Sequence, residues 1–400
     1  MDLRSHYPYW LLRDGIIQTY PSLDKNLDVD IVVIGAGITG ALVAFKLCEA
    51  GEQVVVVDRR HVGMGSTAAS TALLQYEIDI PLHELSTKVG ERDAARSYCL
   101  CIDAINELEK ICSKVNGRSD FVRRPSLQYC SFKKHLPQII KEFEYRKKAG
   151  ISVQFLDSAE LKKLFGIDRA GALFSEDGAA VNAYALTHEL LQFSIQKGLR
   201  VFDHTEIEKI THKKNEVVLQ TSDEFSLRCK KLVIACGYES QRYLNKKVEQ
   251  FHSTYTIASE PLRQDEFWYK NALIWETATP YLYMRTTKDK RIIVGGLDEE
   301  FSNANKRDAI LNRKTDQLEK AFKKLFPAIP FKTDFKWAGT FASTKDGLPY
   351  IGSVAERPNT YFALGYGGNG ITFSVIAANL IRDKIMGRKN WDAEIFKFTR

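Results

Sequence analysis

The sequence lacks a hydrophobic run long enough to cross a membrane as a helix. Its longest apolar stretch, Ile31 to Ile38, is interrupted by two glycines and falls well short of the roughly 18 residues that a span needs. Mean hydropathy is −0.26, and 44% hydrophobic with 27% charged residues is typical of globular domains rather than of disordered or collagen-like chains. We therefore expect a globular protein without stable membrane insertion.

Cysteine and histidine are not arranged as metal ligands. Of the seven cysteines, only Cys99 and Cys101 lie close together, and no second pair follows at zinc-ligand spacing. The eight histidines are scattered along the chain. The sequence predicts reduced thiols and no metal site.

Charge of one sign is not concentrated either. The net charge of +7 comes from 57 basic and 50 acidic residues, and short basic runs such as Arg146 to Lys148 are interpreted as solvated helix faces. Nucleic-acid binders usually gather basic charge on one element, so we expect no nucleic-acid partner. Arg13 and Asp14 interrupt the first apolar stretch before a signal peptide could form, which favours a cytoplasmic location.

The order of periodic segments predicts an α/β fold. A β run at 29–34, a glycine turn, an amphipathic helix at 38–49 and a second β run at 53–57 form a βαβ unit. The tail repeats this order with a strand at 360–364 and a helix at 371–386. Because 400 residues predict two or three domains, we expect a discontinuous dinucleotide-binding domain with antiparallel sheet inserted, mainly at 251–297. Further helices are expected at 83–115, 182–197 and 308–325.

The first glycine motif has the context of a dinucleotide site. Gly35, Gly37 and Gly40 follow a strand and open a helix, so they allow a tight turn, close approach of a pyrophosphate and close packing of helix on strand. The helix N-terminus favours the anion. Asp58 ends the next strand, where an acid binds ribose hydroxyls.

Two further segments extend this interpretation. Residues 63–71 are small and rich in hydroxyls, which suits a backbone running along an extended ligand, although a flexible linker is the alternative. Residues 365–372 form a second glycine turn before a helix, a favourable place for a negatively charged ring edge.

These motifs resemble the ordered FAD segments of the D-amino-acid oxidase superfamily. The resemblance rests on residues 35–58, 232–237, 346–352 and 365–372 and covers nearly the whole chain. Tyr9-Trp10, residues 20–23, and Tyr283-Met284-Arg285 before Gly295-Gly296 are similar to the pattern of gamma-glutamylputrescine oxidase-like members, with glycine and sarcosine oxidases also in the superfamily.

The resemblance implies a Rossmann-like FAD-binding domain (1–88, 170–245 and 336–400) with an inserted antiparallel-sheet substrate domain (89–169 and 246–335). It implies non-covalent FAD and oxidation of the C–N bond of an amine or amino acid by hydride transfer to flavin N5, followed by hydrolysis of the imine. The cofactor contacts that it implies are Gly35, Gly37, Ile38, Thr39, Gly40, Asp58, Arg59, Ser66, Thr67, Ile207, Cys236, Gly237, Asp346, Gly367, Gly368, Asn369, Gly370, Ile371 and Thr372.

The electron acceptor and the substrate contacts are open at this point. Ile293 stands where monomeric sarcosine oxidases carry an oxygen-activating lysine, so the acceptor is oxygen or another compound. A flavin-binding assembly or regulatory protein without turnover is an alternative function. We expect Arg285, with Tyr283 on the same side of a strand, to bind a substrate carboxylate, and Tyr366 to line the site. The alternative is a structural arginine paired with an acid such as Glu276.

Overall fold

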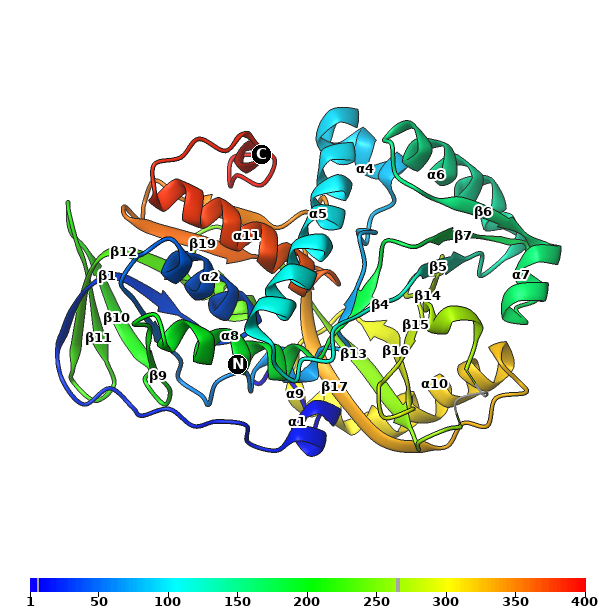
Figure 1. Ribbon diagram of the computed structural model, residues 1–400, viewed down its shortest axis with the longest axis horizontal. Coiled ribbons are helices and arrows are strands. Elements are labelled where there is room, and N and C mark those ends of the chain that lie inside the picture. Colours follow the sequence, from blue (N-terminus) through cyan, green and yellow to red (C-terminus); the bar gives the residue numbers. More distant parts are fainter. Residues whose placement is uncertain (6, 264–266) are drawn as a thin grey trace.

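The fold is built around two large sheets, described from a computed structural model for residues 1–5, 7–263 and 267–400 (Figure 1). The first sheet lies on the left of Figure 1 and the second on the right, with α5 standing between the two halves. Residues 264–266, within the stretch expected to be sheet, lie outside the described residues.

The first sheet has a parallel centre. The spatial order β10-β11-β12-β1-β2-β9 places β1 between β2 and β12, both parallel to it, and β19 pairs in parallel with β12. The four valines of β2 are all buried, as expected for a parallel strand covered on both faces. Its strands are β1 (Leu27–Ile34), β2 (Val54–Val57), β9 (Arg200–Phe202), β10 (Ile207–His212), β11 (Val217–Thr221), β12 (Ser226–Ile234), β18 (Tyr350–Ser353) and β19 (Thr360–Leu364).

The second sheet is antiparallel except where β14 pairs in parallel with β5. Its order is β17-β13-β16-β15-β14-β5-β7-β6, and a small third sheet has the order β3-β8-β4. The strands of the two sheets are β5 (Ser126–Tyr129), β6 (Gln154–Asp157), β7 (Gly171–Ser175), β13 (Gln250–Ser259), β14 (Leu273–Glu276), β15 (Tyr283–Thr286), β16 (Ile292–Glu299), β17 (Thr333–Ser343), β3 (Leu73–Leu74), β8 (Ala179–Ala180) and β4 (Val122–Arg123).

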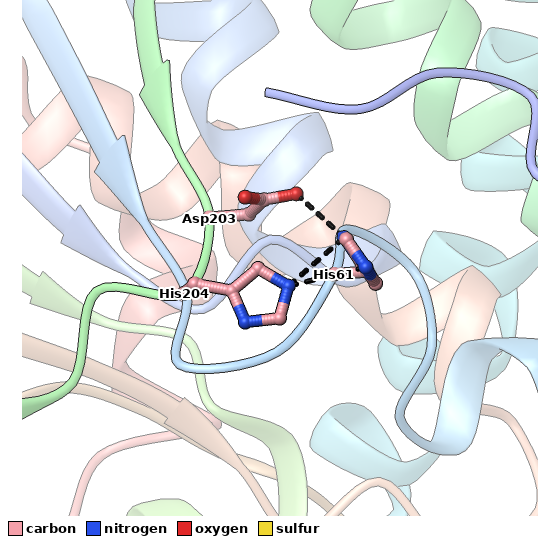
Figure 2. A group of neighbouring side chains, drawn as sticks. All are labelled: His61, Asp203 and His204. Carbon is pink, nitrogen blue, oxygen red and sulfur yellow. Dashed lines mark hydrogen bonds and ion pairs between the residues drawn. The ribbon is translucent and has the colours of Figure 1, made fainter. Parts of the chain in front are cut away.

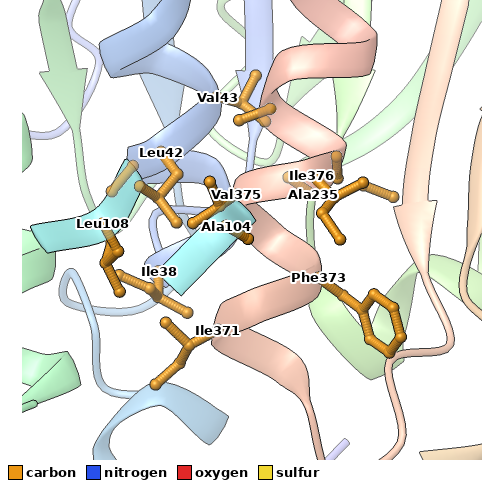
Figure 3. Close-up of a cluster of buried hydrophobic side chains, with 14 of the residues drawn as sticks. Ile38, Leu42, Val43, Ala104, Leu108, Ala235, Ile371, Phe373, Val375 and Ile376 are labelled. Carbon is orange, nitrogen blue, oxygen red and sulfur yellow. The ribbon is translucent and has the colours of Figure 1, made fainter. Parts of the chain in front are cut away.

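Helices of the first half enclose one hydrophobic core. Helix α2 contacts α11 and α8, and α5 contacts both of these. Ile38, Leu42, Ala104 and Val375 meet in this core (Figure 3). The helices are α1 (Tyr9–Asp14), α2 (Ile38–Glu49), α3 (Ser66–Ala69), α4 (Leu82–Val89), α5 (Glu91–Val115), α6 (Leu136–Lys148), α7 (Ser158–Phe165), α8 (Ala183–Ile195), α9 (Ala304–Ala309), α10 (Leu311–Leu325) and α11 (Gly370–Ile385), with 3-10 turns η1 (Lys133–His135), η2 (Gly237–Tyr243), η4 (Tyr269–Asn271) and η5 (Trp391–Glu394).

The prediction of an α/β chain with an antiparallel sheet inserted is confirmed, and two details differ. The single helix expected at 83–115 is two helices, because Gly90 adopts φ +87° and ends α4; glycine accepts this conformation without steric cost. Strands β7 and β17 belong to the second sheet, although the predicted boundaries at 170 and 336 put residues 171–175 and most of 333–343 in the cofactor domain. The domain division as a whole stays a prediction.

Candidate functional site

One large cavity runs along both glycine turns. The space between its walls, open mouth included, is about 1910 Å³. Its walls come from the first glycine turn (residues 35–40), the small-residue segment (63–71), the tail glycine turn (365–370) and the second sheet. Predicted site residues on its wall are Gly35, Gly37, Ile38, Thr39, Asp58, Arg59, Ser66, Thr67, Ile207, Cys236, Gly237, Tyr283, Tyr366, Gly367, Gly368, Asn369, Gly370 and Ile371.

The first glycine turn is held by Asp58. Ala36 N–H donates to Asp58 Oδ2 at 2.7 Å, and Arg60 N–H donates to Asp58 Oδ1 at 2.8 Å. Burial raises the pKa of Asp58, while these two amides stabilise its ionised form. Gly35 has φ +108°, and a Cβ on Gly40 would lie 1.7 Å from Gly35 O. Gly40 therefore packs helix on strand, as its position in the motif predicts, and does not line the cavity.

The small-residue segment completes the helix N-terminus. Thr67 Oγ1 accepts from Ile38 N–H at 3.0 Å, and a Cβ on Gly37 would meet the same oxygen at 2.9 Å. Ser66 and Thr67 belong to the short helix α3 rather than to a loop. A cradle that any Cβ would fill, next to the hydroxyls of Ser66 and Thr67 on the cavity wall, fits the pyrophosphate of a dinucleotide.

The tail glycine turn is bound by an acid that sequence reasoning missed. Gly368 N–H donates to Asp79 Oδ2 at 2.8 Å, and the Tyr281 hydroxyl donates to Asp79 Oδ1 at 3.0 Å. Burial raises the pKa of Asp79, although both donors stabilise its ionised form. Asn369 fixes the turn by donating to the carbonyls of Gln75 and Glu77. No motif in the sequence marks Asp79, because its partners lie 202 and 289 residues away.

Arg285 does not face the cavity, which corrects the expected carboxylate contact. Its guanidinium donates to the backbone carbonyls of Thr286, Thr71, Ala72 and Val181 at 2.7–3.1 Å, and the residue is buried outside the cavity wall. It therefore ties β15 to the segments next to β3 and β8 and is a structural arginine, paired with carbonyls rather than with Glu276.

Two further expected cofactor contacts also lie off the cavity wall. The Asp346 carboxylate pairs with Arg400 at 2.8 Å and accepts from Leu348 N–H. Thr372 is buried in α11, with Gln75 O at 3.5 Å from its hydroxyl. Both residues stabilise the segments that carry the tail glycine turn instead of facing the cavity.

Replacing Arg285 with methionine should reduce stability rather than alter substrate choice. Three or more buried carbonyls would lose a charged donor, so we expect the free energy of unfolding to fall by roughly 2–4 kcal/mol, measured by urea denaturation. The KM ratio between an amine and its carboxylated analogue should not change. An unchanged unfolding midpoint with a tenfold higher KM for the carboxylated compound alone would restore the carboxylate role.

A buried acid behind the tail turn should make stability depend on pH. Glu249 is 2% exposed, and neither carboxylate oxygen has a hydrogen-bond partner among the described residues. Burial raises its pKa from an ordinary value near 4.5 to about 8, with partial compensation from the Gly365 backbone. A raised folded-state pKa means that stability is fully present below pH 4.5 and is lost as pH rises through 8.

The Glu249→Gln variant should remove this loss. Relative to the unsubstituted protein, it should gain on the order of 4 kcal/mol in unfolding free energy between pH 5 and pH 9. Urea titrations of both proteins at the two pH values measure the gain. Parallel stability curves would show that Glu249 is already ionised at pH 5.

The side chains of His61, Asp203 and His204 lie next to one another (Figure 2). His61 Nδ1 lies 2.9 Å from Asp203 Oδ2, and His204 Nε2 lies 3.2 and 3.1 Å from the two His61 nitrogens. Among the residues that the structure describes, these are the three side chains close enough together to hold a metal ion. Hydrogen bonds within the group account for its geometry, and the expected absence of a metal stays a prediction.

The parallel sheet, the two glycine turns and the cavity along them define a dinucleotide-binding fold. Residues 30–384 match the model of the DAO family, FAD dependent oxidoreductase. The chain belongs to this family of FAD-dependent oxidoreductases, as the sequence motifs predicted.

Known relatives agree with this assignment. The chain is 26% identical to gamma-glutamylputrescine oxidoreductase of Escherichia coli, covering 94% of this chain and 87% of the relative. It is 24% identical to glycine oxidase of Geobacillus kaustophilus, with 93% and 97% covered. The crystal structure of that glycine oxidase superposes with a TM-score of 0.79 over 93% of this chain and 99% of the other at 18% identity. L-amino acid deaminase from Proteus vulgaris gives 0.78, over 96% and 100%, at 18% identity.

No helix in the described part of the chain is both long and apolar enough to span a membrane. The cytoplasmic location stays a prediction.

Proposed function

We propose that this protein oxidises a carbon–nitrogen bond of a small amine or amino acid, with FAD held non-covalently along the cavity. The observation that carries the proposal is that one cavity joins the first glycine turn to the tail glycine turn. The first turn and Asp58 suit the pyrophosphate and ribose, and Ser66 and Thr67 offer hydroxyls along the chain of the cofactor. Bound flavin would supply a hydride acceptor.

The reaction balances when bound FAD takes up the two electrons that the substrate loses as a hydride. The carbon next to nitrogen loses a hydride, the nitrogen lone pair forms the C=N bond, and water hydrolyses the resulting imine to a carbonyl compound and free amine or ammonia. No basic residue is needed when the amine enters neutral. Tyr283 and Tyr366 line the cavity and would position the substrate, since the Tyr366 hydroxyl has no partner among the described residues.

Cysteine chemistry supports non-covalent binding. Cys236 is on the cavity wall, but burial raises the pKa of its thiol far above the ordinary value, and its Sγ–H donates to Ile34 O at 3.3 Å. A protonated thiol is a poor nucleophile. The acceptor that reoxidises the flavin is oxygen or another compound. Ile293, at the position of the oxygen-activating lysine of sarcosine oxidases, lies in a buried cluster with Trp10 and Trp337 rather than on the cavity wall.

We also propose that the units around the two sheets have different roles, one in binding FAD and one in binding substrate. The unit around the first sheet, predicted as residues 1–88, 170–245 and 336–400, would hold FAD, and the unit around the second sheet, 89–169 and 246–335, would contact substrate. Tyr283 and Trp275 support this division, because both face the cavity from the second sheet.

An anaerobic screen tests the function. Purified protein is mixed with amino acids, N-methyl amino acids and polyamine derivatives while the visible flavin band is followed. We expect one class to bleach it, and readmitted air then separates oxidase from dehydrogenase by the rate of recovery. A yellow protein that no amine bleaches would favour the flavin-binding role without turnover, and a protein colourless after addition of FAD would overturn the cofactor assignment.

A further inference from the structure

Two carboxyl groups face the cavity beside the tail glycine turn. Asp79 is hydrogen-bonded as described above, and Asp298, at the end of β16, lies on the same wall. Their charges interact: burial raises the pKa of Asp298 to about 6, with a smaller contribution from Asp79. Ionising both buried acids on this wall is costly, so a bound cation would stabilise their charged forms.

Three aromatic rings line the same cavity wall as these acids, and the hydroxyl of one of them, Tyr281, donates to Asp79. Trp275 and Tyr281 meet edge to face with ring centroids 5.8 Å apart, and Tyr281 and Tyr283 are 5.9 Å apart. All three rings line the cavity. Aromatic faces next to carboxylates are the usual recognition site of an ammonium group.

Unpartnered polar atoms point to a ligand at this place. Asp298 Oδ1 is shielded from solvent and has no hydrogen-bond partner among the described residues. Trp275 is 7% exposed, and its Nε1 also has no partner among them. The site therefore offers an unsatisfied anionic acceptor and one neutral donor.

Among the described wall residues, no basic side chain pairs with Asp79 or Asp298. Lys314 attracts Asp298 from outside the wall, but its ammonium group donates to Leu297 O and pairs with Glu299. Among the described wall residues, the basic ones are Arg59, Arg60 and Arg242. Arg59 and Arg60 pair with Glu239, and Arg242 lies 3.8 Å from Glu206. Arg285 is bound to backbone carbonyls. A carboxylate on the substrate would meet Asp79 and Asp298 without a counter-charge.

We propose that Asp79, Asp298 and the three rings form a binding site for a cationic amine that carries no carboxylate next to its reacting carbon. The substrate binds as an ammonium ion and passes one proton to the carboxylate that holds it before its nitrogen lone pair can form the C=N bond. The site thus selects alkylamines and diamines over α-amino acids. As an assignment of substrate class, this rests on the proposed function, whereas cation binding itself does not depend on turnover. The two are separated by measuring binding and flavin reduction independently.

The binding test uses the FAD-loaded protein with probes that cannot be oxidised in this way. Tetramethylammonium and acetate are titrated while the visible flavin spectrum and tryptophan fluorescence are recorded. We expect saturable binding of tetramethylammonium, weakened ten- to a hundredfold in Asp298→Asn, because the variant loses the Coulomb attraction of the carboxylate for the cation. Asp79→Asn should act in the same direction. Asp103→Asn is the matched control, since Asp103 is 61% exposed and pairs with Arg96.

The substrate test uses pairs that differ by one carboxylate. Butylamine is compared with norvaline, and 1,4-diaminobutane with ornithine, by anaerobic bleaching of the flavin. The amine of each pair should reduce the flavin at a lower half-saturating concentration. FAD content of every variant is measured first, so that a loss of cofactor is not read as a loss of amine binding.

The outcomes separate the two proposals. Bleaching by norvaline but not by butylamine would overturn the amine site and keep the redox function. Tetramethylammonium binding that is lost in Asp298→Asn, without bleaching by any amine, would support the site and overturn the redox function. Equal affinity for tetramethylammonium in the Asp298→Asn, Asp79→Asn and Asp103→Asn proteins would overturn the site.

Discussion

Replacing Gly37 with valine should yield a folded protein that no longer retains FAD. Gly37 has φ −80°, so its backbone accepts a side chain, and the obstacle is space. The new Cβ would lie 2.9 Å from Thr67 Oγ1, and the valine methyl groups would extend further into the first glycine turn. Overpacking of this kind costs typically 1–3 kcal/mol, so we expect the Kd for FAD to rise up to about a hundredfold.

Equilibrium dialysis with FAD and the flavin absorbance of the purified protein measure this loss. Gly37→Ala should lie between the valine variant and the unsubstituted protein. Ala50→Val, at the C-terminal end of the same helix and half-buried, should bind FAD normally. Full FAD occupancy in Gly37→Val would show that the pyrophosphate does not pass this turn.

Replacing Arg146 with methionine should cause the largest loss of stability. Arg146 is fully buried; its guanidinium donates to Glu142 Oε1 and Gln128 Oε1, both at 2.8 Å, and lies 3.5 Å from Glu77. Removing the cation would leave the buried carboxylates of Glu142 and Glu77 without a positive partner, which costs about 3–5 kcal/mol in unfolding free energy. Urea denaturation at pH 7 measures the change.

The pH dependence of this loss identifies its cause. Burial opposes ionisation of Glu142, but the Arg146 charge and donors from His83 and Leu82 lower the pKa of Glu142 to about 2. A depressed folded-state pKa gives stability that is present above about pH 4.5 and is lost as pH falls towards 2. The difference between the two proteins should therefore shrink below pH 4.5. Arg96→Met, at a residue 43% exposed, should cost at most about 1 kcal/mol.

Local patterns predicted the parts of the fold that local chemistry determines. Helix α2 spans 38–49 and β19 spans 360–364, both as expected, because glycine turns and hydrophobic periodicity act within a few residues of each other. The end of α4 at Gly90 was missed, because one continuous helix was predicted over 83–115, although a glycine after a periodic segment commonly ends a helix.

Contacts between distant segments were not predictable. Arg146 was interpreted as part of a solvated helix face, yet its partners come from residues 69 and 70 positions away as well as from α6 itself. Arg285 lies on the expected strand, but its guanidinium is held by carbonyls more than 100 residues away. Asp79 and Asp298 belong to no motif, so only the folded chain brings them together.

The position of β19 has a consequence for biosynthesis. Strand β19 pairs with β12, and α11 packs on α2, so the sheet that begins at residue 27 gains its last parallel strand only from residues 360–364. During translation, at about 5–20 residues per second, the edge of β12 and the apolar face of α2 stay uncovered for many seconds after both have left the ribosome. Such exposed edges and faces promote aggregation, so the yield of folded protein in cells should rise with added chaperones and at lower growth temperatures.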